Sequence, residues 1–198
     1  MEKFTKVTGV AAPLMRQNVD TDLIIRIERL VNNTGRQGLG PYCFEQIRFK
    51  PDGSENPDCV LNQAPYRGAP IILSAENFGC GSSREGAVWA LAGMGVKAVI
   101  APSYGDIFYN NCFQNGLLPV TLPEQTVRQI IDKAQANPGW RLNVDLEAQR
   151  IWDDNEEISV SFQIAPFRRY ALLNGLDDIG LTLQHEDKIA AYEAAHGL

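Results

Sequence analysis

The residues best placed to do chemistry lie in one short stretch, Gly-Cys-Gly-Ser-Ser-Arg at residues 79–84. Its glycines permit a tight backbone turn, and either Ser82 or Ser83 can cap a helix that starts with Arg84 and Glu85. A helix start presents unpaired N–H groups that stabilise an anion, and the Arg84 guanidinium adds a planar pair of donors suited to a carboxylate or phosphate. The stretch therefore predicts an anion-binding site that contains hydroxyl groups.

The pattern alone leaves a purely structural role open, because glycine-rich turns before capped helices also occur in α/β domains that bind no ligand. The stretch is not a phosphate-binding loop, since no lysine precedes the serines. It is not a dinucleotide-binding fingerprint either, because Gly79, Gly81 and Gly86 miss the required spacing. Cys80 could be a nucleophile, but no histidine lies near it in the sequence to activate it.

The elements around this stretch predict the fold. An apolar run at 69–73 precedes the glycines and an Ala-Val-Trp-Ala-Leu segment follows them, which gives the order strand, turn, helix. Further strands are predicted at 96–101 and from residue 117, with helices at 106–115 and 123–136 between and after them. This alternation predicts an α/β fold with a parallel or mixed sheet and helices packed on it.

The two ends of the chain add further elements. A first strand is predicted at 4–12, and the segments 141–146, 149–152 and 157–164 have the pattern of further strands. Helices are predicted at 166–174 and 185–195. In the first of these helices, four residues are expected to face the core: Phe167, Tyr170, Ala171 and Leu173. We see no repeat or linker, so the 198 residues favour a single domain.

Composition limits the class of protein. The formal net charge is −6 and no basic run is present, which argues against nucleic-acid binding. No stretch approaches the ~18 apolar residues of a membrane span, and the N-terminus lacks an apolar leader, so we expect a soluble cytoplasmic protein. The four cysteines are widely spaced and both histidines lie near the C-terminus, which predicts no metal or cluster site on this chain.

Two polar segments precede the glycine stretch. Asp20, Thr21 and Asp22 can accept hydrogen bonds from neighbouring backbone N–H groups, so a structural turn is favoured over direct contact with a substrate. The segment 26–40 has three glycines in its last six residues, after a start that could be helical. We expect this loop to be exposed and poorly ordered unless a partner orders it.

At residues 77–85 the sequence resembles the signature of the small subunit of 3-isopropylmalate dehydratase, a family with the aconitase-type swivelling domain. Three more motifs occur in the family's order: Val-Asp-Thr-Asp at 19–22, Ala-Pro-Ser with Asp-Ile-Phe within 101–108, and Asn-Gly-Leu-Asp with Gly-Leu-Thr-Leu within 174–183. The resemblance covers nearly the whole chain. It implies one swivelling β/β/α domain over residues 1–198, as in the C-terminal domain of aconitase.

The resemblance also implies an activity: a two-subunit hydro-lyase that interconverts 2-isopropylmalate and 3-isopropylmalate in leucine biosynthesis. A large subunit is expected to carry a [4Fe-4S] cluster, and the small subunit is expected to close over a small 2-hydroxy dicarboxylic acid. Carried onto this sequence, Ser82 is expected to be the catalytic base, with Ser83 and Arg84 binding the substrate. The chain alone would then be inactive.

Two departures from the family pattern leave the substrate open. After Asp-Thr-Asp-x-Ile-Ile the family usually continues with proline and a Lys-Gln-Phe-like run, where this chain has Arg-Ile-Glu-Arg at 26–29, and it usually has histidine in place of Gly86. Because the family's loop reaches the variable side chain of the substrate, Arg26, Arg29 and Arg36 are candidates to meet a smaller or polar group. The alternatives are a methylmalate or citraconate-type hydratase and a non-catalytic anion-binding module of the same fold.

Overall fold

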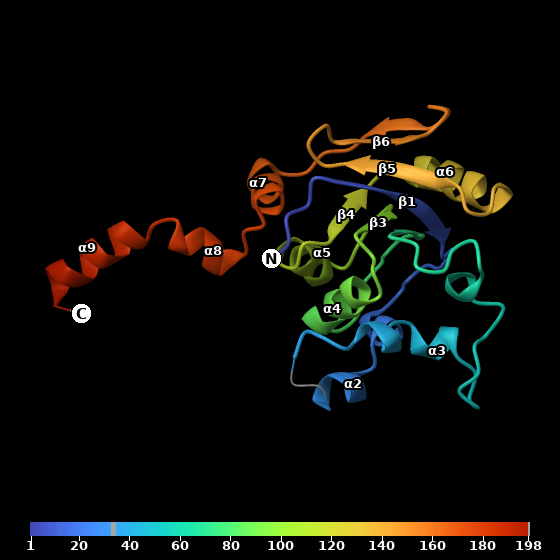
Figure 1. Cartoon of the computed structure of the whole chain (residues 1–198), viewed down its shortest axis with the longest axis horizontal. Coiled ribbons are helices and arrows are strands. Elements are labelled where there is room, and N and C mark those ends of the chain that lie inside the picture. The colour runs from blue at the N-terminus through green and yellow to red at the C-terminus, as the bar shows by residue number, and fades with distance from the viewer. Residues whose placement is uncertain (33–34, 198) are drawn as a thin grey trace.

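A mixed sheet organises the molecule. The computed structural model describes residues 1–32 and 35–197, which form a seven-stranded sheet with the order β4-β3-β2-β1-β5-β6-β7 (Figure 1). The parallel half contains β1 (Lys6–Pro13), β2 (Ile71–Leu73), β3 (Ala98–Ala101) and β4 (Leu118–Thr121). The antiparallel half adds β5 (Arg141–Asp145), β6 (Arg150–Asp153) and β7 (Ser159–Ser161). The predicted α/β class with a mixed sheet is confirmed.

Helices cover both faces of the parallel half. The strands β2 and β3 are buried along their whole length, which explains their continuous apolar sequences. Ile72 and Val99 point to the face covered by α4 (Glu85–Gly93) and α5 (Asp106–Gln114). Ile71 and Ile100 point to the opposite face, where α6 (Glu124–Ala136) packs its predicted apolar stripe. Alternate side chains of each strand thus belong to two separate cores.

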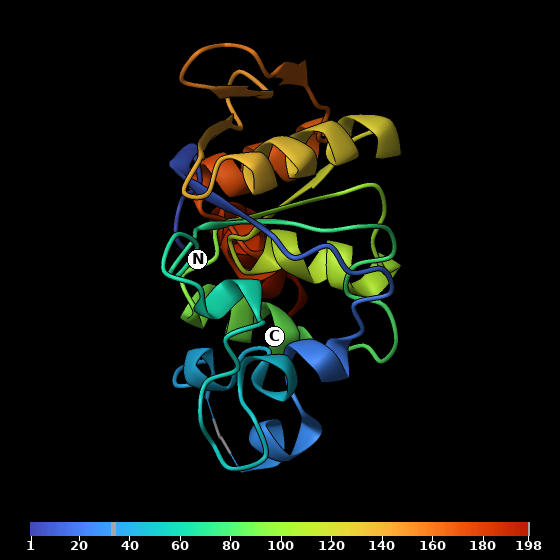
Figure 2. The ribbon, with the colours of Figure 1, turned by 90° about the vertical axis from the view of Figure 1, so that its right-hand side faces the viewer.

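A layer of short helices lies beyond α4, on its side away from the sheet (Figures 1 and 2). It comprises α1 (Thr21–Ile24), α2 (Ile27–Val31), α3 (Glu45–Arg48) and a 3-10 turn at Gly40–Tyr42, while a second 3-10 turn at Val60–Asn62 lies beside β1. Gly40 packs directly on α4, because a Cβ added to it would lie 2.2 Å from the Gly93 carbonyl oxygen. This layer is therefore built on the helix that follows the glycine stretch.

Both predicted C-terminal helices are present, and a further short helix lies between them. The first, α7 (Pro166–Asn174), ends at Gly175, and α8 (Asp178–Leu183) and α9 (Glu186–His196) extend away from the sheet (Figure 1). Ala171 is buried as expected, but Phe167 and Tyr170 are 66% and 48% exposed, so their predicted place in the core is wrong.

The side of α7 that faces the body carries a cation–π contact instead of the two aromatic side chains. The Arg168 guanidinium lies over the rings of Tyr109 and Phe113 on α5, 5.1 and 5.0 Å from their centres. With Arg168 packed on α5 and Leu172 fully buried, the opposite side of α7, which carries Phe167 and Tyr170, faces outward. Within the two described ranges, no helix combines the length and the apolar character needed to cross a membrane.

Candidate active site

The signature loop, residues 79–84, leaves the carboxyl edge of the parallel strands after β2 and leads into α4. Gly79 has φ +72° and Gly81 has φ +83°, a region that favours glycine. A Cβ on Gly79 would also lie 2.1 Å from the ring of Phe108, so this position requires glycine for packing as well as for conformation. The role predicted for these glycines as turn formers is confirmed.

The turn at 19–22 holds the signature loop in place. The Asp20 carboxylate caps α1 by accepting a hydrogen bond from the Leu23 N–H at 2.6 Å. Thr21 donates its N–H to the Cys80 carbonyl at 2.9 Å and its hydroxyl to the Ser82 carbonyl at 2.8 Å. The structural turn favoured from the sequence is therefore present, and it supports the loop.

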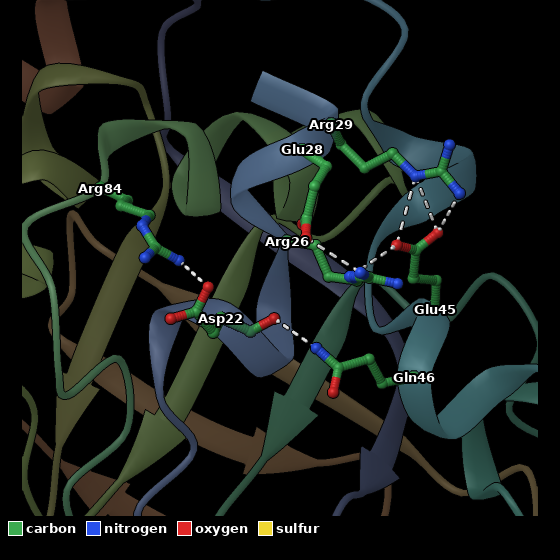
Figure 3. Close-up of polar contacts among 7 residues, drawn as sticks. All are labelled: Asp22, Arg26, Glu28, Arg29, Glu45, Gln46 and Arg84. Atoms are coloured by element: carbon green, nitrogen blue, oxygen red, sulfur yellow. Dashed lines mark hydrogen bonds and ion pairs between the residues drawn. The ribbon is translucent and has the colours of Figure 1, made fainter. Parts of the chain in front are cut away.

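Arg84 is fixed beside the loop by a carboxylate. Its side chain is 16% exposed and one guanidinium nitrogen pairs with Asp22 (Figure 3). The backbone of Asp22 is itself held, because its carbonyl accepts a hydrogen bond from the Gln46 amide at 3.1 Å. A guanidinium has five N–H donors, and the pair with Asp22 uses one nitrogen. Arg84 is thus oriented and keeps donors for an anionic ligand.

The expected serine cap is wrong. Helix α4 begins at Glu85, Arg84 occupies the N-cap position, and no side chain caps the helix. The reason is that Arg84 is extended, with φ −121° and ψ 103°, while the Thr21 hydroxyl holds the Ser82 carbonyl outside the helix. Both serines are exposed. These two serines therefore do not close the helix end, and they directly precede Arg84 in the chain.

A half-buried amide that was not predicted from the sequence holds the start of α4. Asn115, just after α5, donates to the Glu85 carboxylate at 2.8 Å and accepts a hydrogen bond from the Trp89 indole N–H at 2.9 Å. A single asparagine after a helix carries no recognisable pattern, so only the folded structure identifies it. It joins the end of α5 to the helix that carries Arg84 and so limits the movement of both.

The three candidate specificity arginines lie in two places. Arg29 forms an ion pair with Glu45 at 2.8 Å, and Arg26 pairs with Glu28 at 3.0 Å and lies 3.8 Å from Glu45 (Figure 3). These two guanidiniums thus join α2 to α3. Arg36 instead lies beside the signature helix, 5.4 Å from the centre of the Trp89 ring and 4.0 Å from the Glu85 carboxylate.

The loop at 26–40 is only partly described. Its start is helical, as the sequence suggested, since α2 spans Ile27–Val31. Residues 33 and 34 lie outside the described residues, and the expected mobility of the loop stays a prediction.

Gly86 lets α2 approach the signature helix. A Cβ added to this residue would lie 2.4 Å from one δ-carbon of Leu30 and 2.9 Å from the other. Gly86 is buried in the first turn of α4, two residues beyond Arg84. The residue that follows the first departure is therefore in contact with the second, because Leu30 rests where a side chain at position 86 would be.

The environments of three cysteines disfavour their thiolate forms. Burial, together with the nearby Asp20 carboxylate, raises the pKa of the Cys80 thiol, so it is protonated near neutral pH. Burial also raises the pKa values of Cys43 and Cys112. Among the described residues, no group of three or more His, Cys, Asp or Glu side chains could hold a metal ion.

The site is open to solvent. One cavity of about 540 Å³ lies beside residues 15–18 and the start of α6, and another of about 770 Å³ is lined by Arg26, Arg29 and the α3 region. Neither is lined by a residue of the signature loop. Ser82, Ser83 and Arg84 thus lie together on a surface, and a second surface is needed to enclose a ligand there.

Family models match most of the chain. The aconitase C-terminal domain matches residues 1–125, a model described as LeuD_N matches residues 128–166, and the C-terminal domain of the 3-isopropylmalate dehydratase small subunit matches residues 178–196. A 3-isopropylmalate dehydratase small subunit from Gluconacetobacter diazotrophicus is 54% identical over 98% of this chain and 93% of its own length. One from Paramagnetospirillum magneticum is 52% identical over 98% of this chain and 95% of its own length.

A solved structure agrees with the sequence matches. The crystal structure of 3-isopropylmalate dehydratase from Methanocaldococcus jannaschii has a TM-score of 0.68 and 26% identity, and covers 95% of this chain and 99% of its own. The resemblance seen in the sequence motifs is confirmed. The chain therefore belongs to the family of 3-isopropylmalate dehydratase small subunits, a family of hydro-lyases.

Proposed function

We propose that this chain, together with a large subunit, interconverts 2-isopropylmalate and 3-isopropylmalate in leucine biosynthesis in the cytoplasm. The observation that carries the proposal is that two exposed serines directly precede Arg84, which Asp22 holds in place. This group can bind a carboxylate and accept a proton, and its open position requires a partner surface. Relatives of this chain that are over 50% identical bear the name of the small subunit of that enzyme.

We place the iron–sulfur cluster on the large subunit. The cysteines of this chain do not fit such a group, because Cys43, Cys59 and Cys112 are buried and the described residues contain no candidate metal site. This chain then contributes the groups that bind and deprotonate the substrate. It is expected to be inactive and free of iron when purified alone.

In the proposed reaction Ser82 is the catalytic base. As its alkoxide, Ser82 takes a proton from a substrate carbon, the electron pair of that C–H bond forms the double bond, and hydroxide leaves from the neighbouring carbon. Transfer of the serine proton to the hydroxide then gives water and restores the alkoxide. Addition of water in the opposite orientation gives the isomer. A serine alcohol is a weak base in water, but a nearby guanidinium stabilises its anion in an enclosed site. Closure by the large subunit would provide that enclosure.

Arg84 is proposed to hold a substrate carboxylate, with Ser83 as a further hydrogen-bond donor. A planar guanidinium binds a carboxylate through two parallel N–H bonds, which fixes its orientation as well as its charge. Asp22 is then a positioning residue, since it contacts Arg84 and fixes the direction in which the remaining donors point. Orientation of this kind lowers the entropic part of the activation barrier.

The substrate side chain is proposed to meet the loop at 26–40. Glu28 and Glu45 neutralise Arg26 and Arg29, so these two arginines fit a structural role better than a polar substrate contact. Arg36 lies beside the signature helix and stays a candidate to contact a smaller or polar group. A methylmalate or citraconate-type hydratase is therefore the second candidate.

One experiment separates these candidates. The chain is co-expressed with the large subunit of the same organism, and kcat/KM is measured for isopropylmalate and for methylmalate, with the loop 26–40 either native or replaced by the usual Pro-Lys-Gln-Phe-type loop. We expect a preference for isopropylmalate that the replacement changes. The two side chains differ by two carbons, and each is worth ~1 to 3 kcal/mol of discrimination. Preference for methylmalate would support the second candidate. Absence of activity on both would contradict the enzyme and favour an anion-binding module.

A further inference from the structure

The C-terminal arm, residues 178–197, leaves the body of the molecule and carries α8 and α9 (Figure 1). Every residue from 182 to 197 is exposed, and α9 buries none of its eleven residues. A helix of this length is marginal in water when it stands alone, because most helical stability in proteins comes from packing of an apolar face. The arm therefore lacks the contacts that would normally stabilise it.

Large apolar side chains lie along the arm. Ile179 and Leu183 on α8 and Ile189 and Tyr192 on α9 are between 38% and 72% exposed. Their spacing of four and three residues places each pair on one side of its helix. A run of exposed apolar residues on consecutive helices is typical of a surface that binds another protein.

The base of the arm is fixed to the body. The Gln114 side chain forms two hydrogen bonds with Asp178. Its amide donates to the Asp178 carboxylate at 2.8 Å, and its amide oxygen accepts from the Asp178 backbone N–H at 3.2 Å. The Asp177 carboxylate caps α8 through the Gly180 N–H at 2.8 Å, and the N-terminal ammonium donates to the Gly175 carbonyl at 3.1 Å. The direction in which the arm leaves the body is thus set by the fold, while the segment beyond it is exposed.

We propose that the C-terminal arm docks into an apolar groove on the large subunit, rimmed by basic side chains. The inference rests on the proposed function, which requires such a partner. The charge of the arm favours this occupant over a second copy of the chain, because residues 178–197 contain four carboxylates and one lysine and the whole chain has a net charge of −6. Self-docking would bring like charges together.

Docking through the arm would also leave the signature loop free to form the active site. The arm joins the body at α5 and α7, whereas Ser82 to Arg84 lie at the carboxyl edge of the parallel strands. The arm is a recognisable unit of the sequence as well, since the family's C-terminal model matches residues 178–196 separately from the models that match the body. The arm is therefore a second contact with the partner, distinct from the catalytic one.

The test compares binding of the large subunit to three forms of the full chain. One is unmodified, one carries Ile189→Asp with Tyr192→Asp, and the control carries Ala191→Asp with Ala194→Asp. Both variants place two carboxylates on α9, but the control places them on the opposite side of the helix. Neither should change the denaturation midpoint of the isolated chain, because α9 has no buried residue.

We expect the Ile189→Asp, Tyr192→Asp variant to raise the Kd for the purified large subunit at least tenfold and the control to raise it less than threefold. Equal affinity of all three forms would overturn the arm inference and leave the proposed function intact. Failure of the unmodified chain to bind would contradict both. If sedimentation shows that the isolated chain forms a dimer that the Ile189→Asp, Tyr192→Asp variant loses, the occupant is a second copy and the inference is wrong.

Discussion

Adding one methyl group at Gly86 should push against Leu30 and so test how α2 is packed on the signature helix. The new Cβ would lie 2.4 Å from one δ-carbon of Leu30, closer than two carbon atoms can approach. Overpacking of this kind costs about 1 to 3 kcal/mol. Because the clash falls on the end of a flexible side chain, we take the lower part of this range, about 1 to 2 kcal/mol.

A second effect has the opposite sign. Gly86 lies inside α4, and replacing glycine by alanine in a helix gains about 1 kcal/mol in propensity. The Gly86→Ala variant should therefore range from neutral to about 1 kcal/mol less stable than the native chain. In a Leu30→Ala background the clash is absent, and the same substitution should stabilise by about 1 kcal/mol.

The assay is chemical denaturation of the isolated chain in all four combinations. The expected coupling between the two substitutions is about 1 to 2 kcal/mol, which a double-mutant cycle measures directly. The stability lost when the Leu30 side chain is removed cancels in this cycle, because both chains that carry Leu30→Ala share that loss. If Gly86→Ala stabilised the chain equally in both backgrounds, α2 would not rest on α4 and the reasoning that joins the two departures would be wrong.

Three further predictions concern other parts of the molecule. Burial opposes ionisation of Asp153, but hydrogen bonds from Lys133 and the Ile158 N–H outweigh burial and lower the pKa of this carboxyl group. The ionised Asp153 should therefore stabilise the fold above about pH 4, and this stabilisation should be lost as the pH falls further. Asp153→Asn, which leaves Lys133 without its buried partner, should cost about 3 kcal/mol in urea denaturation at pH 7, and a loss below about 1 kcal/mol would contradict the pairing. The thiol of Cys80 should react slowly with a disulfide reagent at pH 7 and faster as the pH rises, because its pKa is raised, whereas rapid reaction at pH 7 would show a thiolate. In the two-subunit enzyme, Arg84→Lys should lower kcat/KM tenfold or more although the charge is kept, and unchanged kinetics would place the carboxylate contact elsewhere.

Local backbone requirements were the part of the site that the sequence could predict. The glycines before Ser82 indicated a turn with positive φ, and Gly79 and Gly81 have it. The polar residues at 19–22 indicated a supporting turn, which the hydrogen bond from Thr21 to the Ser82 carbonyl confirms. Both depend on the conformation of a few neighbouring residues, so a short window of sequence contains the information.

Contacts between distant segments could not be predicted in the same way. The position of the α4 cap depends on Thr21, 61 positions before Ser82, and so the expected serine cap was wrong. The outward position of Tyr170 depends on Arg168 packing over α5. The role of Asn115 likewise exists only when α5 has been brought against α4. Each case requires knowledge of which elements meet, and periodicity within one element does not supply it.

The most direct test of the central claim is kcat of the two-subunit enzyme with Ser82→Ala, with Ser83→Ala as the matched control. The Ser82 side chain is exposed and caps nothing, so its loss should leave subunit affinity and the denaturation midpoint unchanged. Because Ser82 is the proposed base, the Ser82→Ala substitution should lower kcat on 3-isopropylmalate by ~10² to 10⁴-fold, and Ser83→Ala should lower it less. If kcat stayed within threefold of the native value, or fell only in step with stability, Ser82 would not be the base.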